Sequence, residues 1–219
     1  MIILLLLLFP YFGKEQIEKD TKNEFVGNRV EITNENNSWE LRKHEDGVFI
    51  YQRWIEAELG RKARDLYAEI LVAANPDALT QIIRDEKYGT KWLSMADEYK
   101  VLKKTSDQVW VAYSRFDLMP ALRFDLITRN ELHQNLNDHS ITVRISGEPD
   151  YIPEDKKYRR LSHFEGQWEF VPIDSMHTRI RYYLFSKTKP FLPRWITDPF
   201  VFGELENCVS NVKHLAEQL

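Results

Sequence analysis

The chain ends in the segment Phe202-Gly-Glu-Leu-Glu-Asn-Cys-Val-Ser-Asn-Val-Lys-His-Leu-Ala-Glu-Gln-Leu219. Apolar residues recur in this segment at steps of three and four, which places them on one stripe of an α-helix. The stripe consists of Phe202, Leu205, Val209, Val212, Ala216 and Leu219. An amphipathic helix has to bury its apolar stripe against another layer. The remainder of the chain is therefore expected to supply an apolar face for this helix.

The region before this helix has the period-two pattern of β-strands. Six strands are expected, over residues 98–104, 108–118, 123–135, 140–147, 163–171 and 179–186. Three earlier strands are expected over residues 39–45, 48–56 and 63–73, and Asp46-Gly47 between the first two is a strong hairpin signal. The charged, proline-containing stretch 148–160 is expected to form a long surface loop.

Two short helices are expected between the third and fourth strands. Asn75-Pro76-Asp77 has the residue types of a helix start, because Asn caps, Pro suits the first turn and Asp favours the positive end of the helix dipole. This helix is expected to end near Asp85, and Lys91-Trp92-Leu93 follows in a second short turn. The fold class is therefore α+β: a helix-grip fold, in which a curved antiparallel β-sheet wraps around a long C-terminal α-helix.

The first 38 residues differ in composition from the rest, and all six Trp lie at or after Trp39. Residues 2–9 are an unbroken apolar run, too short for the roughly 20 residues that span a membrane. The length of the run suits a signal peptide, so we expect residues 1–13 to be a signal peptide and 14–38 a polar linker with a short helix. Residues 39–219 are expected to form one domain.

Several classes of function have no sequence support. The formal net charge is −4 and there is no long basic run, so nucleic-acid binding is not expected. The sequence lacks a Gly-x-Ser-x-Gly elbow, a phosphate-binding glycine loop and a His-Glu-x-x-His motif. Neither a metal nor another cofactor is expected. Cys208 is the only cysteine; it lies on the apolar stripe and is expected to be a buried, inert thiol.

Some residues are candidates for the interior. Alternation along 163–170 places Phe164, Gly166, Trp168 and Phe170 on the inner face, where Gly166 is expected to leave room. Arg123 and Asp125 stand two apart in a strand and project to the same face. On the concave face they would be a polar pair in an apolar cavity; on the other face they would form a solvent salt bridge. Along 179–185 the two faces are not assigned, and the inward tyrosine is either Tyr182 or Tyr183.

The order of these motifs resembles that of the START (steroidogenic-acute-regulatory-protein-related lipid-transfer) domain. The resemblance covers nearly all of residues 39–219 and is carried by the following landmarks: Trp39, the Asp46-Gly47-Val48 hairpin ending at Tyr51, Trp92, Pro120 before Arg123 and Asp125, Gly166 with Trp168, and Leu192-Pro193 before the last helix. It implies a hydrophobic tunnel that shields one lipid or sterol, with the C-terminal helix and neighbouring loops as a lid. In the family, Arg and Asp stand side by side, whereas here Phe124 separates them.

Three hypotheses follow. The favoured one is a non-enzymatic domain that binds a single lipid or other hydrophobic ligand in an internal cavity, with transfer and sensing both left open as its purpose. Its candidate ligand-binding residues are Trp92, Trp110, Tyr113, Arg123, Asp125, Trp168 and Tyr183. The alternatives are an enzyme of the polyketide cyclase or aromatase type, with Arg123 and Asp125 as polariser and acid or base, and an interaction domain whose hollow is filled by side chains.

The partners expected under the favoured hypothesis are a lipid or sterol-like small molecule and, transiently, a membrane surface. The protein is expected to be a monomer. It is expected to be exported, to the periplasm or the medium, or to be membrane-peripheral; without a signal peptide at residues 1–13 it would be cytoplasmic.

Overall fold

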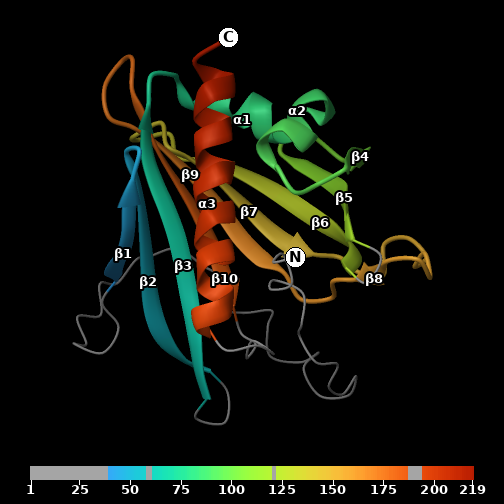
Figure 1. The fold of residues 1–219 in the computed structure, drawn as a ribbon. Helices are drawn as coiled ribbons and strands as arrows, with labels where there is room; N and C mark the ends of the chain where they lie inside the picture. Colours follow the sequence, from blue (N-terminus) through green and yellow to red (C-terminus); the bar gives the residue numbers. More distant parts are fainter. Residues whose placement is uncertain (1–38, 58–60, 120–121, 187–193) are drawn as a thin grey trace.

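A computed structural model describes residues 39–57, 61–119, 122–186 and 194–219. The predicted signal peptide and linker, Pro120 and Leu192-Pro193 lie outside the described residues. The chain folds into one highly curved sheet with a long helix across its concave side (Figure 1). The α+β helix-grip class is confirmed.

The sheet has the strand order β1-β2-β3-β10-β9-β7-β6-β5-β4, with every neighbouring pair antiparallel. A short strand, β8, pairs in parallel with β6. The strands are β1 Glu40–Glu45, β2 Val48–Ala57, β3 Arg61–Val72, β4 Glu98–Lys104, β5 Val109–Met119, β6 Leu122–Gln134, β7 Ile141–Gly147, β8 Arg159–Arg160, β9 Glu165–Pro172 and β10 Thr178–Ser186.

Local sequence signals explain the turns and helix starts. Asp46 and Gly47, between β1 and β2, both have positive φ angles, 48° and 79°, as a two-residue type I′ hairpin requires. The side chain of Asn75 accepts a hydrogen bond from the backbone N–H of Ala78 at 2.8 Å, which caps α1 (Pro76–Arg84). Asp85 ends α1 and caps α2 (Glu86–Trp92) by accepting from the N–H of Lys87 at 3.0 Å.

The third helix, α3, spans Arg194–Ala216 and so begins before the first residue of the predicted stripe. Its buried residues follow that stripe: Val201, Leu205, Cys208, Val209, Val212 and Ala216. Leu219 lies beyond the helix and is 66% exposed, so the last member of the predicted stripe is not packed. No helix among the described residues has the length and apolarity needed to cross a membrane.

The prediction of a surface loop over 148–160 was wrong at its end. Arg160 belongs to β8 and its side chain is buried. Its guanidinium donates to both carboxylate oxygens of Asp125, at 2.7 and 2.9 Å, and to the carbonyl oxygens of Pro149 and Ile152 at 2.5 and 3.1 Å. A charged stretch appears exposed by composition, but here one of its arginines fastens the loop to the sheet.

Candidate ligand-binding site

The concave face of the sheet is built by alternate residues of each strand, because successive side chains of a strand point to opposite faces. Figure 1 shows α3 running across this face, with α1 and α2 beside its C-terminal part. Apolar residues of α3 and of the strands form one buried cluster, which includes Ile50, Ala68, Ile180, Leu205 and Val209. The prediction that the last helix buries its stripe against the sheet is confirmed.

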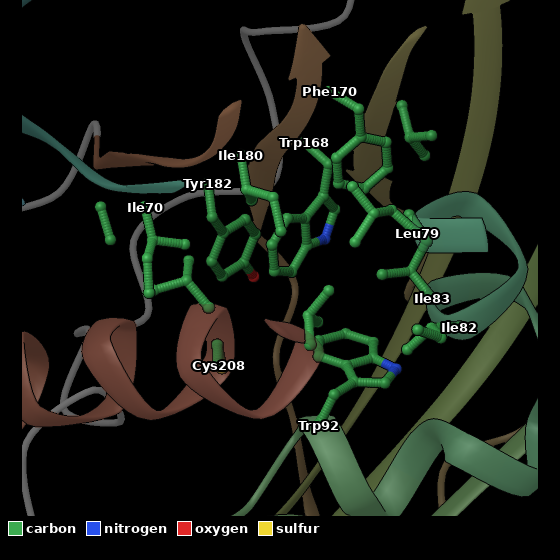
Figure 2. Close-up of a cluster of buried hydrophobic side chains, with 14 of the residues drawn as sticks. Ile70, Leu79, Ile82, Ile83, Trp92, Trp168, Phe170, Ile180, Tyr182 and Cys208 are labelled. Atoms are coloured by element: carbon green, nitrogen blue, oxygen red, sulfur yellow. The ribbon is translucent and has the colours of Figure 1, made fainter. Parts of the chain in front are cut away.

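One part of the concave face, which we name the aromatic half, is filled by large rings. The rings of Trp168 and Tyr182 stack with centroids 4.0 Å apart, and Trp92 from α2 meets Trp168 edge-on at 5.7 Å. The ring centroid of Phe170, also on β9, lies 6.0 Å from that of Trp168. Figure 2 shows these side chains packed together between α3 and α1, from which Leu79, Ile82 and Ile83 project. In this half the protein's own side chains occupy the space under the helix.

The adjoining part, which we name the polar half, carries buried polar side chains on the same face: Gln52, Arg64, Ser114, Thr128 and Asn130. The strand register separates the halves. One row across the sheet contains Leu132, Val143, Trp168, Tyr182, Ala68 and Ile50, and the next row contains Asn130, Ile145, Gly166, Leu184, Leu66 and Gln52. A second, smaller apolar cluster lies beyond the polar residues and contains Ala96, Phe116, Phe124 and Leu126.

Polar groups buried in an apolar interior are costly unless they are hydrogen-bonded. The Asn130 amide donates to the carbonyl and hydroxyl oxygens of Thr128, each at 3.2 Å. Arg64 donates to both carboxylate oxygens of Asp198 on α3, at 2.7 Å each, and to Gln52 at 3.4 Å. The Arg64–Asp198 pair therefore ties β3 to the N-terminal part of α3. The polar half thus combines apolar walls with a few fixed polar groups, as small-molecule sites do.

Gly166 does not leave open space, contrary to the sequence-based expectation. A Cβ atom there would lie 3.1 Å from the Tyr183 carbonyl oxygen and 3.4 Å from Cε1 of Phe164. The missing side chain lets the Phe164 ring lie against the strand. Gly166 is therefore a packing residue of the polar half.

A carboxyl group lies at the edge of this interior, on α3. Glu204 accepts a hydrogen bond from the Ser94 hydroxyl at 3.2 Å, and the Cys208 thiol is 3.7 Å from its other oxygen. Burial raises the pKa of the Glu204 carboxyl above its ordinary value. Burial, reinforced by Glu204, also raises the pKa of the Cys208 thiol well above its ordinary value. Cys208 is therefore held as a neutral thiol and is a poor nucleophile, as predicted.

The seven residues predicted to bind ligand divide between the two faces of the sheet. Trp92, Trp110 and Trp168 lie on the concave side within the main buried cluster. The other four alternate with concave-face residues and so lie on the convex face: Tyr113, Arg123, Asp125 and Tyr183.

The predicted pairing of Arg123 with Asp125 needs correction. Arg123 instead donates to Asp117 at 2.9 Å near the surface, while Asp125 pairs with the buried Arg160. The two residues do share a face, as expected, but that face is turned away from α3. On the same face, the Tyr183 hydroxyl donates to Glu169 at 3.1 Å, and burial raises the pKa of Tyr113 to about 12.

Sequence reasoning missed the polar residues of the concave face. Ser114, Thr128 and Asn130 were not among the predicted site residues, because polar residues in alternation usually face water. The available signal was spacing: each lies an even number of positions from an apolar residue of its own strand, namely Phe116, Phe124 or Leu126, and therefore shares its face. Glu204 was also missed. Of the two tyrosines whose face was left open, Tyr182 lies on the concave face, beside Trp168. No group of three His, Cys, Asp or Glu residues arranged to hold a metal is found in the part of the chain that the structure describes.

A surface pocket of about 490 Å³ lies between α1 and the turns that join β4 to β5 and β6 to β7. Charged and amide side chains contribute most of its walls, among them Asp77, Arg84, Lys104 and Gln108. Arg84 donates to the carbonyl oxygen of Asp107 across it at 2.7 Å. This pocket is separate from the polar half of the concave face.

Comparisons with known proteins agree with the architecture. An uncharacterized protein of Pseudomonas aeruginosa is 25% identical over 181 residues, which are 82% of this chain and 87% of that protein. A STAR-related lipid transfer protein fragment from Xanthomonas axonopodis superposes with a TM-score of 0.70 at 24% identity, covering 81% of this chain and 98% of the fragment. No family model matches the chain.

Two further solved structures have the same fold at lower identity. Human StAR-related lipid transfer protein 5 has a TM-score of 0.66 at 14% identity, covering 82% of this chain and 86% of its own. The Zhui aromatase/cyclase from Streptomyces has a TM-score of 0.52 at 14% identity, covering 71% and 94%. The chain thus has the START helix-grip fold.

Proposed function

We propose that this chain, which has the START helix-grip fold, binds one lipid or other hydrophobic molecule between the polar half of the sheet and α3. The observation that carries the proposal is the division of the concave face. The aromatic half is filled by packed rings, and the polar half presents hydroxyl and amide groups in an otherwise apolar interior. A few fixed polar groups in an apolar site orient a ligand, and burial of its apolar surface supplies the affinity.

The likeness to lipid transfer proteins supports this proposal. Release and uptake would require α3 to move away from the sheet, since it covers the concave face (Figure 1). The two hydrogen bonds from Arg64 to the Asp198 carboxylate, each 2.7 Å long, hold the N-terminal part of α3 next to β3. We further propose that the protein acts without catalysis, as a monomer, and that it contacts a membrane only transiently. Export also stays a prediction.

The enzymatic alternative is supported by the aromatase/cyclase that has this fold, but the residues predicted to catalyse do not support it. Arg123 and Asp125 lie on the convex face and bind Asp117 and Arg160 respectively. A reaction in the interior would have to use other groups. The alternative of an interaction domain with a filled hollow has the packed aromatic half in its favour.

A pair of matched substitutions tests the proposal. Thr128→Phe adds a ring on the concave face in the polar half, and Thr142→Phe adds the same ring to the convex face of β7, next to β6. Native mass spectrometry of protein purified from its own host should show a bound hydrophobic molecule in the wild type and in Thr142→Phe. Thr128→Phe, checked for its fold by circular dichroism, should lose that mass.

Two results would contradict the proposal. One is the absence of any bound molecule in all three proteins after mild extraction and after incubation with lipids. The other is an equal amount of ligand in Thr128→Phe and in the wild type, which would place the binding site elsewhere. A ligand chemically altered by the wild type would favour the enzymatic alternative.

A further inference from the structure

Glu204 occupies an unusual position for a carboxyl group. It lies on α3 four residues before the buried Cys208, next to the segment that joins α2 to β4. Its carboxyl oxygens accept from three hydrogen-bond donors: the Ser94 hydroxyl at 3.2 Å, the Cys208 thiol at 3.7 Å and the backbone N–H of Met95. No Lys or Arg among the described residues forms an ion pair with it.

The other carboxylates of α3 contrast with Glu204. Asp198 pairs with Arg64, Glu206 pairs with Lys43 at 2.5 Å, and Glu217 lies 3.9 Å from Lys213. A partly buried carboxylate is stabilised mainly by a cation or by several hydrogen bonds. Glu204 has neutral donors only, so it retains the capacity to accept a further hydrogen bond or to pair with a cation.

A second polar group is directed to the same place. Tyr182 is 5% exposed, and its ring is fixed by stacking on Trp168. Figure 2 shows its hydroxyl pointing toward α3, in the direction of Cys208. No hydrogen bond joins this hydroxyl to another described residue, yet Glu204 and Cys208 are near enough to raise the pKa of Tyr182, after the larger effect of burial. The Tyr182 hydroxyl can therefore donate to a ligand atom placed beside Glu204.

We propose that Glu204, with the Tyr182 hydroxyl, binds the polar end of the ligand, and that this end is a hydrogen-bond donor without negative charge, namely an alcohol or an ammonium group. This inference rests on the proposed function. An alcohol would donate to a free lone pair of the Glu204 carboxyl and accept a hydrogen bond from the Tyr182 hydroxyl. An ammonium group would donate both to the carboxyl and to the Tyr182 hydroxyl oxygen. A phosphate or carboxylate would face Glu204 with no compensating cation nearby, and like charges at short range repel. Fatty acids and anionic phospholipid headgroups are therefore disfavoured at this position.

Three single-chain probes of equal length test the inference: 1-hexadecanol, hexadecylamine and hexadecanoate, each delivered from a cyclodextrin complex. Displacement of the co-purified molecule, followed by native mass spectrometry, gives their relative affinities. The alcohol or the amine should bind the wild type about tenfold or more tightly than the carboxylate, since hydrogen bonds to a charged group are strong. The comparison of alcohol with amine then identifies which donor the site takes.

Variants separate ligand recognition from a structural role. Glu204→Ala should remove the preference over hexadecanoate, and Glu204→Gln should weaken the amine more than the alcohol, because the amide keeps an acceptor but not the charge. Glu206→Gln, the same change on the same helix, is the matched control and should leave the preference unchanged. Ser94→Ala removes the hydroxyl that donates to Glu204 and should also leave the preference over hexadecanoate unchanged.

Two outcomes would overturn the inference and leave the proposed function intact: tighter binding of hexadecanoate to the wild type, or a preference for the donors that survives in Glu204→Ala. If Ser94→Ala abolishes the preference as Glu204→Ala does, then Glu204 acts only by joining α3 to the α2–β4 segment. Failure of every probe to bind, with no co-purified molecule, would instead count against the proposed function itself.

Discussion

Both faces of the sheet bury aromatic rings, but the two sets of rings have different surroundings. On the concave face, Trp168 and Tyr182 are covered by α3 and by Trp92 of α2. On the convex face, Tyr51, Tyr67 and Tyr183 form a ladder across β2, β3 and β10, with centroids 4.7 and 5.0 Å apart. None of the helices in the described part of the chain covers that ladder; Trp39 lies over it, 4.6 Å from Tyr67.

The comparison shows that aromatic content alone does not locate a ligand site. Tyr182 and Tyr183 are neighbours in sequence, are both buried, and belong to different faces. The convex ladder is surrounded by charged side chains, such as Arg181, which pairs with Glu69 at 2.5 Å. The concave set continues directly into the polar half. What distinguishes the two regions is the kind of neighbour that each ring has.

The largest difference between the faces is expected from truncation of one ring on each. Trp168→Ala should lower the free energy of unfolding by about 3–5 kcal/mol, because it opens a cavity between α3 and the sheet that the surrounding rings cannot fill. Tyr183→Ala should cost about 1–3 kcal/mol, since α1, α2 and α3 all lie on the other face and the ladder can relax. Urea unfolding followed by circular dichroism measures both. Equal losses would mean that the ladder is packed as rigidly as the core under the helix.

A smaller effect concerns the ion pairs of the convex face. Asp125→Asn leaves the guanidinium of Arg160 buried without its counter-charge, and the loss should be about 3 kcal/mol. Asp117→Asn breaks the Arg123 pair at the surface and should cost less than about 1 kcal/mol. Urea unfolding gives both values. Hydrogen exchange of residues 148–160 should rise in Asp125→Asn alone, since Arg160 also binds the carbonyl oxygens of Pro149 and Ile152.

These ion pairs also show which features of the fold could be predicted from the sequence. Strand and helix positions follow from local signals, such as the Asp46-Gly47 hairpin and the Asn75 cap, and the structure confirms them. The faces of the strands were harder to assign, because Arg123 and Asp125 are polar on an outward face while Thr128 and Asn130 are polar on the inward one. Alternation defines two faces but does not identify which one a helix covers.

Contacts between residues distant in sequence could not be predicted at all. Arg160 reaches Asp125 across 35 positions, and Arg64 reaches Asp198 across 134. Such pairs depend on the strand order, which places β6 beside β8 and β3 under α3. No local sequence pattern indicates the order of the strands in the sheet. Glu204 was missed for the same reason, because its partner Ser94 comes from another element.

The smallest expected effect is a difference in how two tyrosines, one on each face of the sheet, lose their protons as the pH rises. Burial, and secondarily the charge of Asp125, raises the pKa of Tyr113 on the convex face from 10.0 to about 12. The folded protein therefore holds this proton at pH values where the unfolded chain has released it. The stabilisation is complete below pH 10 and is lost as the pH rises towards 12. Tyr113→Phe should flatten the decline of stability over that interval.

Tyr182 on the concave face provides the contrast, because burial raises its pKa well above the ordinary value. Its phenol should ionise only when the protein unfolds, whereas Tyr113 should ionise with the fold intact. Spectrophotometric titration of the wild type, Tyr113→Phe and Tyr182→Phe, with circular dichroism recorded in parallel, separates the two. If Tyr182 ionised before the loss of structure, then water would reach its hydroxyl beneath α3, and the space beside Glu204 would be open without any ligand.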